Sequence, residues 1–462
     1  MRYVSTRGDA PVLGFSDVLL AGLAADGGLY VPDHWPTLLA VTAEMTYAEA
    51  AVEIMWPFVE EDLDRDVFEA MVVDAYATFD SPDVTPLVDL SALAPNLQLL
   101  ELFHGPTLAF KDVALQLVGR LFDHELQRRA EKVTIIGATS GDTGSAAIEA
   151  LRDRDAIEVF ILHPAGRVSE VQRRQMTTVL SPNVHNIAVD GTFDDCQDLV
   201  KAAFGDRSLR EALKLSAVNS INWARVMAQV VYYAVAAART NGGGRVAFSV
   251  PTGNFGNVFA GDVARKGGVP ISRLVIGSNR NDILIRFLEG GVLEAERVMP
   301  TISPSMDIQV SSNFERLLFD AAGRDGHAVT ALLGRYRAAG KAEVGPEVWG
   351  AVTSAFTGAR VDEDETLATI RRVHEETGVL VDPHTAVGIA AALAKRGDEA
   401  IPMISLATAH PAKFPDAVEQ AVGFRPPLPE HLADLYEREE RCDELPNDLD
   451  ALRTYILANT TT

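Results

Sequence analysis

Hydrophobic and polar residues follow a helical period through the first part of the chain. Two segments, AEMTYAEAAVEIMWPFVEEDL (43–63) and DRDVFEAMVVDAYATF (64–79), place apolar side chains three or four positions apart, as amphipathic helices do. The proline-rich stretch SPDVTPLVDL (81–90) then interrupts the pattern. We therefore predict a largely helical N-terminal region over residues 1–95.

From about residue 131 the pattern changes to short, continuous apolar runs, each followed by a helical segment. Strands without polar alternation are typical of parallel sheets that helices cover on both faces. We therefore predict a doubly wound, mostly parallel α/β fold. The runs are KVTIIGA (132–138), AIEVFILHP (156–164), VHNIAVD (184–190), LKLSAVNS (213–220), RVAFSVP (245–251) and RLVIGSN (273–279).

Later in the chain, residues 313–375 have a helical pattern without a clear strand. Strand-like runs return at GVLVDP (378–383) and IPMISLATA (401–409). Besides the N-terminal region, we predict two α/β domains around a ligand cleft, because ligands of such sheets bind beyond the carboxyl ends of the strands. The larger domain comprises residues 96–130 and 225–462, with a helical insertion at about 290–375, and the smaller comprises residues 131–224.

Composition and charge exclude several classes of protein. Across 462 residues, 41 Lys and Arg stand against 65 Asp and Glu, a formal net charge of −24. Nucleic acids and anionic membranes attract basic surfaces, so we expect neither as a partner. The longest apolar run, Val226–Ala238, contains Gln229 and is too short to span a membrane. The two cysteines, Cys196 and Cys442, favour a reducing cytoplasm, and the N-terminus has no apolar signal segment.

Lys111 stands in an unusual place for a lysine, directly behind an Ala-Phe pair in FHGPTLAFKD (103–112). A lysine normally keeps its ammonium group in water. Burying it costs free energy unless it has a partner or a covalent role. The turns of the predicted sheet indicate which of these applies.

The first such turn is GATSGDTGSAA (137–147), which follows a strand and opens a helix. Its glycines and the free N–H groups of a helix N-terminus suit an anion. It lacks the lysine of a Walker A loop and the glycine spacing of a nucleophile elbow. The alternative is a tight turn in which Ser140, Asp142 or Thr143 caps the helix.

The second turn, PTGNFGN (251–257), also joins a strand to a helix. Gly253 and Gly256 permit close approach of the backbone, and Asn254 and Asn257 offer side-chain amides, so the turn suits a phosphate group. It lacks the third glycine of a dinucleotide fingerprint. The alternative is an ordinary Asn/Gly turn that caps the helix.

Two further residues are candidates for binding a ligand. Thr408 ends an apolar strand, where its hydroxyl group is able to bond a ring nitrogen or, alternatively, its own backbone. Arg225 follows the natural N-cap Asn222 in an apolar helix, where its charge opposes the helix dipole unless an anion binds there. The alternative is an Arg225 that points to solvent or pairs with an acid. Two anion-accepting turns and a poorly placed lysine together favour a phosphate-bearing cofactor that forms a Schiff base.

The order and spacing of these motifs resemble the threonine synthase family over nearly the whole chain. This family depends on pyridoxal 5'-phosphate (PLP) and has the tryptophan-synthase-β-like fold, called fold type II. The N-terminal YVSTRG and GLAADGGLYVP resemble its longer form. The other motifs are FHGPTLAFKD, GATSGDTGSAA, NSINWAR, PTGNFGN, NRNDIL, MDIQVSSNFERLLF, DPHTAVG and LATAHPAKF.

The resemblance implies a role for each candidate residue. Lys111, in the family's FKD motif, would form the Schiff base with PLP in the larger domain, and Thr408 would lie beside the pyridine nitrogen. Asp142 stands where many relatives have Asn beside the cofactor ring. The residues that would cradle the cofactor phosphate are Gly253, Asn254, Phe255, Gly256 and Asn257. The residues that would contact the carboxylate and phosphate of the substrate are Ser140, Thr143, Asn219 and Arg225.

The resemblance also implies a reaction, the last step of threonine biosynthesis in the aspartate family pathway. O-phospho-L-homoserine and water would become L-threonine and phosphate in a PLP-dependent lyase reaction, with no metal. The freed amine of Lys111 would act as the base. We expect a monomer or a homodimer. Open alternatives are a related phospho-lyase that releases 2-oxobutyrate, a dehydratase or sulfhydrylase of the same cofactor fold, and a non-catalytic amino-acid sensor.

Overall fold

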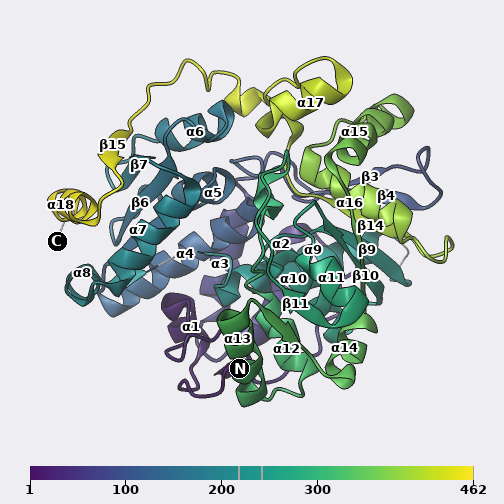
Figure 1. Cartoon of the computed structure of the whole chain (residues 1–462), viewed down its shortest axis with the longest axis horizontal. Helices are drawn as coiled ribbons and strands as arrows, with labels where there is room; N and C mark the ends of the chain where they lie inside the picture. Colours follow the sequence, from purple (N-terminus) through teal and green to yellow (C-terminus); the bar gives the residue numbers. More distant parts are fainter. Residues whose placement is uncertain (217–218, 241–242, 461–462) are drawn as a thin grey trace. The chain divides into compact units, whose positions relative to one another are not determined.

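The computed structural model describes residues 1–216, 219–240 and 243–460 (Figure 1). Its contacts divide the chain into two compact units, which are described separately below. Unit 1 comprises Met1–Leu19, Leu23–Ala114 and Ser220–Pro426. Unit 2 comprises Leu20–Gly22, Leu115–Asn219 and Pro427–Thr462. Residues 115–130 and 427–462, which the sequence analysis assigned to the larger domain, are thus grouped with unit 2.

Unit 1 is built on a six-stranded sheet with the strand order β13-β10-β9-β14-β4-β3. All neighbouring strands are parallel except β3, which runs antiparallel to β4. The order of the strands in the sheet differs from their order in the sequence. Parallel strands are joined by crossover helices, so strands that follow one another in the sequence need not be neighbours in the sheet. The strands are β3 (Leu87–Asp89), β4 (Leu97–Glu101), β9 (Val246–Pro251), β10 (Ile271–Ser278), β13 (Phe356–Arg360) and β14 (Met403–Ala407).

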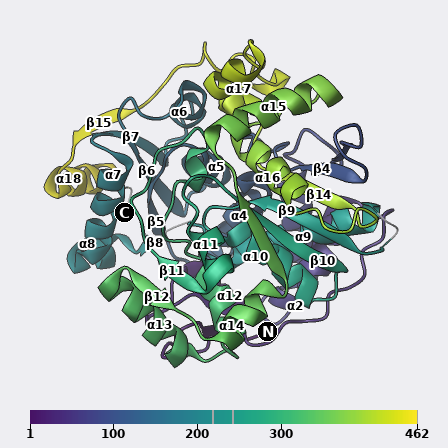
Figure 2. The ribbon, with the colours of Figure 1, turned by 45° about the vertical axis from the view of Figure 1, so that its right-hand side comes forward.

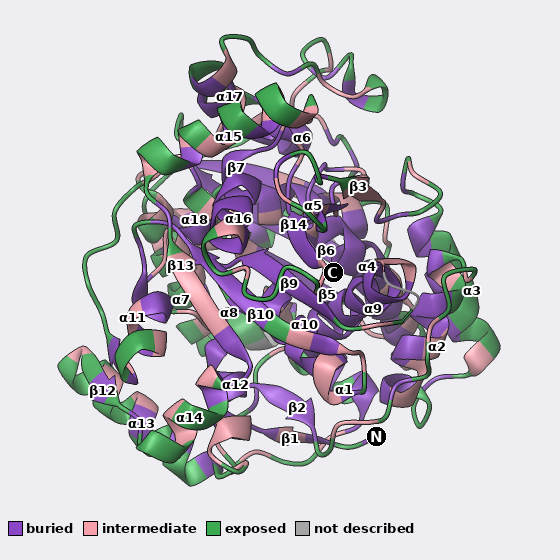
Figure 3. Cartoon of the chain, turned by 90° about the vertical axis from the view of Figure 1, so that its right-hand side faces the viewer, coloured by how far each residue is buried: buried purple, intermediate pink, exposed green. Residues whose placement is uncertain are grey.

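Helices cover both faces of this sheet, which explains its continuous apolar runs. Ala247 of β9 packs in a cluster with Ile389 of α16 (Pro383–Ala394) on one face. The next residue, Phe248, contacts Tyr233 of α9 (Trp223–Thr240) with ring centroids 4.8 Å apart on the other face. Successive side chains of a strand point to opposite faces, so both must be apolar. Figure 3 shows the central strands and α16 buried. The doubly wound α/β prediction is confirmed.

The remaining elements of unit 1 include the predicted N-terminal helices α2 (Tyr47–Val59) and α3 (Arg65–Tyr76). The pattern missed a short antiparallel pair, β1 (Tyr3–Ser5) with β2 (Tyr30–Pro32), because strands of three residues have too few positions to show a period. The other elements are α10 (Gly256–Lys266), α11 (Ile283–Gly290), β11 (Val292–Glu294), α12 (Phe314–Ala321), α13 (Gly326–Ala339), β12 (Lys341–Glu343), α14 (Pro346–Thr353), α15 (Glu363–Thr377) and α17 (Pro415–Val422). Helix α1 (Phe15–Ala21) begins in unit 1, and α4 (Lys111–Arg129) begins in unit 1 and continues in unit 2.

Unit 2 has a five-stranded parallel sheet with the order β15-β7-β6-β5-β8. Its core includes Leu452 and Ile456 from the C-terminal helix. Figure 2 shows this helix, labelled α18, beside α7. The strands are β5 (Val133–Ala138), β6 (Ile157–Pro164), β7 (Val184–Asp190), β8 (Leu215–Ser216) and β15 (Asp443–Pro446). The helices are α5 (Asp142–Leu151), α6 (Glu170–Thr177), α7 (Phe193–Gly205), α8 (Arg207–Leu213) and α18 (Leu449–Asn459). Of the predicted strand 213–220, residues 217–218 lie outside the described part.

Two sequence predictions about strands are wrong. Residues 313–375 contain β12 and also β13, the edge strand of the large sheet. Most of β13 is half-buried or exposed, so it lacks the apolar run by which the other strands were found. The run GVLVDP forms no strand and leads into α16, which Asp382 caps. The run is apolar because it packs on a hydrophobic core, not because it forms a strand. Val381 belongs to that core cluster, and Val379 packs against it.

Candidate active site

Three neighbouring parallel strands of unit 1 lead into the segments that the sequence selected for chemistry. Strand β4 precedes the Lys111 loop, β14 ends just before Thr408, and β9 ends at Pro251 in the turn 251–257. In the sheet, β14 lies between β9 and β4. Because carboxyl ends of parallel strands share one edge of a sheet, the fold collects these segments there.

Lys111 is held beside Thr408 by backbone hydrogen bonds. Phe110 N donates to Thr408 O at 2.9 Å, and His410 N donates to Leu108 O at 3.0 Å. Lys111 opens α4 and is 8% exposed. Its Nζ lies 4.9 Å from the ring centroid of Phe110. The predicted neighbours are therefore brought together, and the predicted burial of Lys111 is confirmed.

The loop before Lys111 is held in a constrained shape. The buried Asp112 carboxylate accepts hydrogen bonds from Thr107 N at 2.8 Å and from Thr107 Oγ1 at 2.7 Å. Leu108 has a φ of 62°, in the left-handed region that a leucine rarely adopts. The bonds of Asp112 and the pairing with residues 408–410 hold this conformation, so the position of Lys111 is well defined.

The Thr408 hydroxyl group has no hydrogen-bond partner among the described residues, although Thr408 is 6% exposed. Its backbone N donates instead to Thr385 Oγ1 at 3.2 Å. Thr385 is in turn held by the buried Asp382, whose Oδ1 also accepts from Thr385 N at 3.0 Å. The alternative in which Thr408 bonds its own backbone is not observed, and the hydroxyl group is left for a ligand.

The turn 251–257 has the geometry of an anion cradle. No N–H group from Gly253 to Asn257 has an acceptor among the described residues. Phe255 has a φ of 65° at the N-cap of α10, and an added Cβ at Gly253 would lie 2.5 Å from Ser305 O. Asn257 Oδ1 accepts from the hydroxyl groups of Tyr232 and Tyr233, which leaves its buried Nδ2 without a partner. Free N–H groups at a helix N-terminus favour a phosphate.

Arg225 is a buried cation without a counter-charge in the described structure. It is 4% exposed, and its Nε and Nη1 have no hydrogen-bond partner there. Burial lowers the pKa of the Arg225 guanidinium to about 10. Asn222 caps the helix as expected, accepting from Ala224 N at 3.0 Å. Both alternatives for Arg225, solvent exposure and pairing with an acid, are therefore excluded, and the geometry suits an anion.

In unit 2, the turn that precedes α5 is built differently from the prediction. Thr139 Oγ1 accepts from the N–H groups of Gly141 and Gly144, both at 2.9 Å. The alternative in which Ser140, Asp142 or Thr143 caps the helix is therefore not observed, because the Thr139 hydroxyl group accepts from these N–H groups instead. Asp142 is buried and accepts from Gln172 Nε2 at 2.8 Å. Thr143 is half-buried, while Ser140 and Asn219 are exposed.

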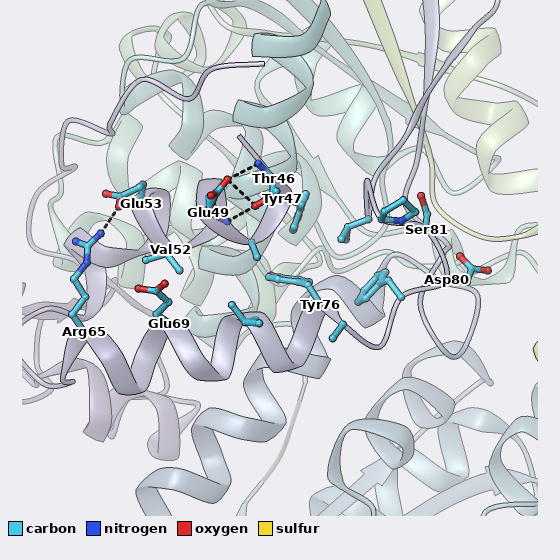
Figure 4. Close-up of a pocket in the computed structure, with 16 residues that line it drawn as sticks. Thr46, Tyr47, Glu49, Val52, Glu53, Arg65, Glu69, Tyr76, Asp80 and Ser81 are labelled. Atoms are coloured by element: carbon cyan, nitrogen blue, oxygen red, sulfur yellow. Dashed lines mark hydrogen bonds and ion pairs between the residues drawn. The ribbon is translucent and has the colours of Figure 1, made fainter. Parts of the chain in front are cut away.

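A cavity of about 810 Å³ elsewhere in unit 1 contains none of the predicted site residues (Figure 4). Helices α2 and α3 and residues 77–84 line it. Two of its carboxylates have internal roles: Glu49 closes the capping box of α2 with Thr46, and Glu53 pairs with Arg65. Among the described residues, no group of His, Cys, Asp and Glu has the arrangement of a metal site. In the same described part of the chain, no helix is long and apolar enough to cross a bilayer.

The comparison with known proteins first defines a class. A family model described as pyridoxal-phosphate dependent enzyme matches residues 79–333. The residues described above fit that cofactor: an N–H cradle for its phosphate, the buried Lys111, and the free hydroxyl group of Thr408. The protein is a PLP-dependent enzyme.

Further matches define the family. Models described as threonine synthase N terminus and threonine synthase, C-terminal match residues 2–76 and 385–456. A threonine synthase of Pseudomonas aeruginosa is 53% identical, with 99% of this chain and 98% of the relative covered. The structure of PLP-bound threonine synthase from Brucella melitensis matches with a TM-score of 0.97 and 51% identity, over 100% of both chains. The yeast enzyme matches with a TM-score of 0.94 and 41% identity, over 99% of this chain and 98% of that one. The chain belongs to the threonine synthase family and is a PLP-dependent lyase.

Proposed function

We propose that this chain converts O-phospho-L-homoserine and water to L-threonine and phosphate. The observation that carries the proposal is that unit 1 offers two separate anion-accepting features. One is the row of free N–H groups at residues 253–257, and the other is the unpartnered Arg225. A PLP enzyme needs one phosphate site for its cofactor, so a second one favours a phosphorylated substrate.

We assign the cofactor contacts to unit 1. Lys111 would hold PLP covalently through Nζ, and the Thr408 hydroxyl group would face the pyridine nitrogen. A neutral hydroxyl partner leaves that nitrogen less positive than a carboxylate would, which favours elimination over transamination. The cofactor phosphate would be held by Gly253, Asn254, Phe255, Gly256 and Asn257.

We assign the substrate contacts to Ser140, Thr143, Asn219 and Arg225. Arg225 suits the substrate phosphate because a guanidinium group contacts two phosphate oxygens at once. We assign Asp142 to cofactor binding. The hydrogen bond from Gln172 Nε2 holds the Asp142 carboxylate in one orientation.

The bound cofactor supplies an electron sink for the charge left at the substrate Cα. Lys111 Nζ would remove the proton from Cα, and its burial keeps water from the amine. Arg225 would stabilise the phosphate that leaves from Cγ, since a cation aimed at developing negative charge lowers the barrier. A second proton must leave Cβ before the phosphate is able to depart from Cγ. Water then supplies the hydroxyl group at Cβ, and protons return to Cγ and to Cα, which gives the methyl group and the Cα–H bond of threonine.

The experiment that tests this function follows three products at once. Purified enzyme with PLP is incubated with O-phospho-L-homoserine, and phosphate, threonine and 2-oxobutyrate are measured together. We expect one threonine for each phosphate. Phosphate matched by 2-oxobutyrate would make the protein a phospho-lyase, and no phosphate release would reject the substrate. Lys111→Ala serves as the control and is expected to release none of the three.

We further propose that the enzyme is cytoplasmic. We propose that it binds this small-molecule substrate and no nucleic acid. The net charge of −24 and the two free cysteines, Cys196 and Cys442, support this proposal. Gel filtration with light scattering would distinguish a monomer from a homodimer.

A further inference from the structure

Asn313 joins the two anion-accepting features of unit 1. Its side-chain Nδ2 donates to Asn254 O at 2.9 Å, in the phosphate turn, and to Ser220 O at 3.0 Å, in the segment that leads to Arg225. Its backbone N also donates to Asn254 O at 3.1 Å. Asn313 is fully buried. One side-chain amide thus uses both of its protons to link the two segments.

These bonds also orient the N–H groups of the phosphate turn. Asn254 O is bound to Asn313, and Gly253 O accepts from Ser311 Oγ at 2.7 Å. In a trans peptide unit the N–H group points away from the C=O group. With both carbonyl groups turned toward residues 311–313, the N–H groups of Asn254 and Phe255 point to the opposite side, where a phosphate would be bound.

Arg316 determines which way the Asn313 amide faces. Its Nη1 donates to Asn313 Oδ1, so that a flipped amide would place its NH₂ group against a cation. Its Nη2 donates to Ile221 O at 2.6 Å and to Tyr30 O at 2.9 Å. Arg316 is fully buried, and burial lowers the pKa of its guanidinium to about 9. The amide is therefore held from both ends.

We propose that Asn313 is a positioning residue that sets the spacing between the cofactor-phosphate turn and the Arg225 segment. The proposal rests on the proposed function for the roles of these two segments. It predicts that changing Asn313 weakens cofactor binding and substrate binding together. Substitutions of Ser311 and Arg225 should separate the two effects. Among the described residues, Ser311 bonds the phosphate turn and not the Arg225 segment, whereas Arg225 lies on that segment.

The test compares three variants by PLP affinity and by the KM for O-phospho-L-homoserine. Asn313→Asp keeps the volume but places a carboxylate oxygen against two carbonyl oxygens, so we expect PLP dissociation constant and KM each to rise about 10-fold or more. Ser311→Ala should raise the PLP dissociation constant by roughly 2- to 10-fold and leave KM unchanged. Arg225→Ala should raise KM alone. PLP affinity is measured by titrating PLP into the cofactor-free enzyme, without turnover.

Asn186→Asp is the matched control, because Asn186 is a buried asparagine of unit 2 whose Nδ2 donates to Met176 O at 2.9 Å. It should leave PLP affinity within 2-fold of wild type. An Asn313→Asp enzyme with PLP affinity and KM both within 2-fold of wild type would overturn the proposal. If that variant does not fold, unchanged PLP affinity in Ser311→Ala overturns it. A wild type that binds PLP but makes no threonine would reject the proposed function alone.

Discussion

At the scale of single residues, the candidate site contains buried polar groups that have no protein partner. Arg225 Nε, Arg225 Nη1 and Asn257 Nδ2 have this property in the described part of unit 1, and the Thr408 hydroxyl group of a buried residue makes no hydrogen bond there either. A buried group that lacks a hydrogen bond costs about 1–3 kcal/mol, and an unpaired charge costs more. Each is therefore explained better by a ligand than by the stability of the fold.

Arg225 provides the first prediction at this scale. Replacing a buried unpaired cation by a residue of similar volume removes a desolvation penalty, so Arg225→Met should raise the free energy of unfolding of the ligand-free protein by about 1–4 kcal/mol. Affinity for the phosphorylated substrate should fall at the same time. Urea denaturation and steady-state kinetics measure the two effects. A variant that is less stable than wild type without ligand would show that Arg225 supports the fold.

His104 provides a prediction about pH. Burial lowers the pKa of His104, but hydrogen bonds and charge interactions with Glu101 and Asp80 outweigh burial and raise it above its ordinary value of 6.5. The folded state thus favours the protonated form. Its stabilisation is complete below the ordinary pKa and is lost as the pH rises through the folded-state pKa. The urea midpoint difference between wild type and His104→Gln should therefore shrink from about pH 6 to about pH 9. A pH-independent difference would contradict this.

At the scale of elements, glycines decide how closely helices approach. In unit 2, a Cβ added to Gly119 of α4 would lie 2.3 Å from Ala150 O of α5. In unit 1, a Cβ added to Gly334 of α13 would have no neighbour within 4 Å. The two positions thus form a matched pair in which the same substitution meets opposite surroundings.

Gly119→Ala should destabilise the protein by about 1–3 kcal/mol, because the two helices must move apart. Gly334→Ala should stabilise it by about 0.5–1 kcal/mol, because alanine loses less backbone entropy in a helix. Thermal and urea unfolding of both variants would check the signs. Equal effects at the two positions would show that the close approach of α4 and α5 does not matter.

At the scale of the whole molecule, the C-terminal segment completes the core of unit 2. Strand β15 pairs in parallel with β7, and Leu452 and Ile456 of α18 join the apolar cluster beneath β6 and β7. A segment that begins hundreds of residues after β7 in the chain therefore forms one edge of this sheet. The stability of unit 2 should depend on it.

Ile456→Ala should destabilise unit 2 by about 2–5 kcal/mol, because it leaves a cavity in a closed cluster. Its neighbour Leu457 is 49% exposed, and Leu457→Ala serves as the control with little expected change. Hydrogen exchange of the β6 and β7 amides would report the loss directly. Unchanged exchange in the Ile456 variant would show that α18 does not support the core.

Much of the molecule could be predicted from local patterns. The apolar runs located β5, β6, β7, β9, β10 and β14, and the motifs located Lys111, Thr408 and the turn 251–257. Edge strands β13 and β15 escaped prediction because an edge strand is partly exposed and needs no continuous apolar run. Asn313 lay in a motif that resembled the family, but its role depends on contacts 59 and 93 residues away.

The sequence by itself determined the fold class, the family and the candidate residues, because periodicity and motif spacing are local properties. Tertiary structure alone decided which of the open alternatives holds at each residue. Whether Arg225 meets solvent, an acid or neither depends on what packs around it, and the same is true of the Thr408 hydroxyl group. The capping of α5 by Thr139 and the link through Asn313 were decided in the same way, because the direction of a hydrogen bond is set by atoms in space.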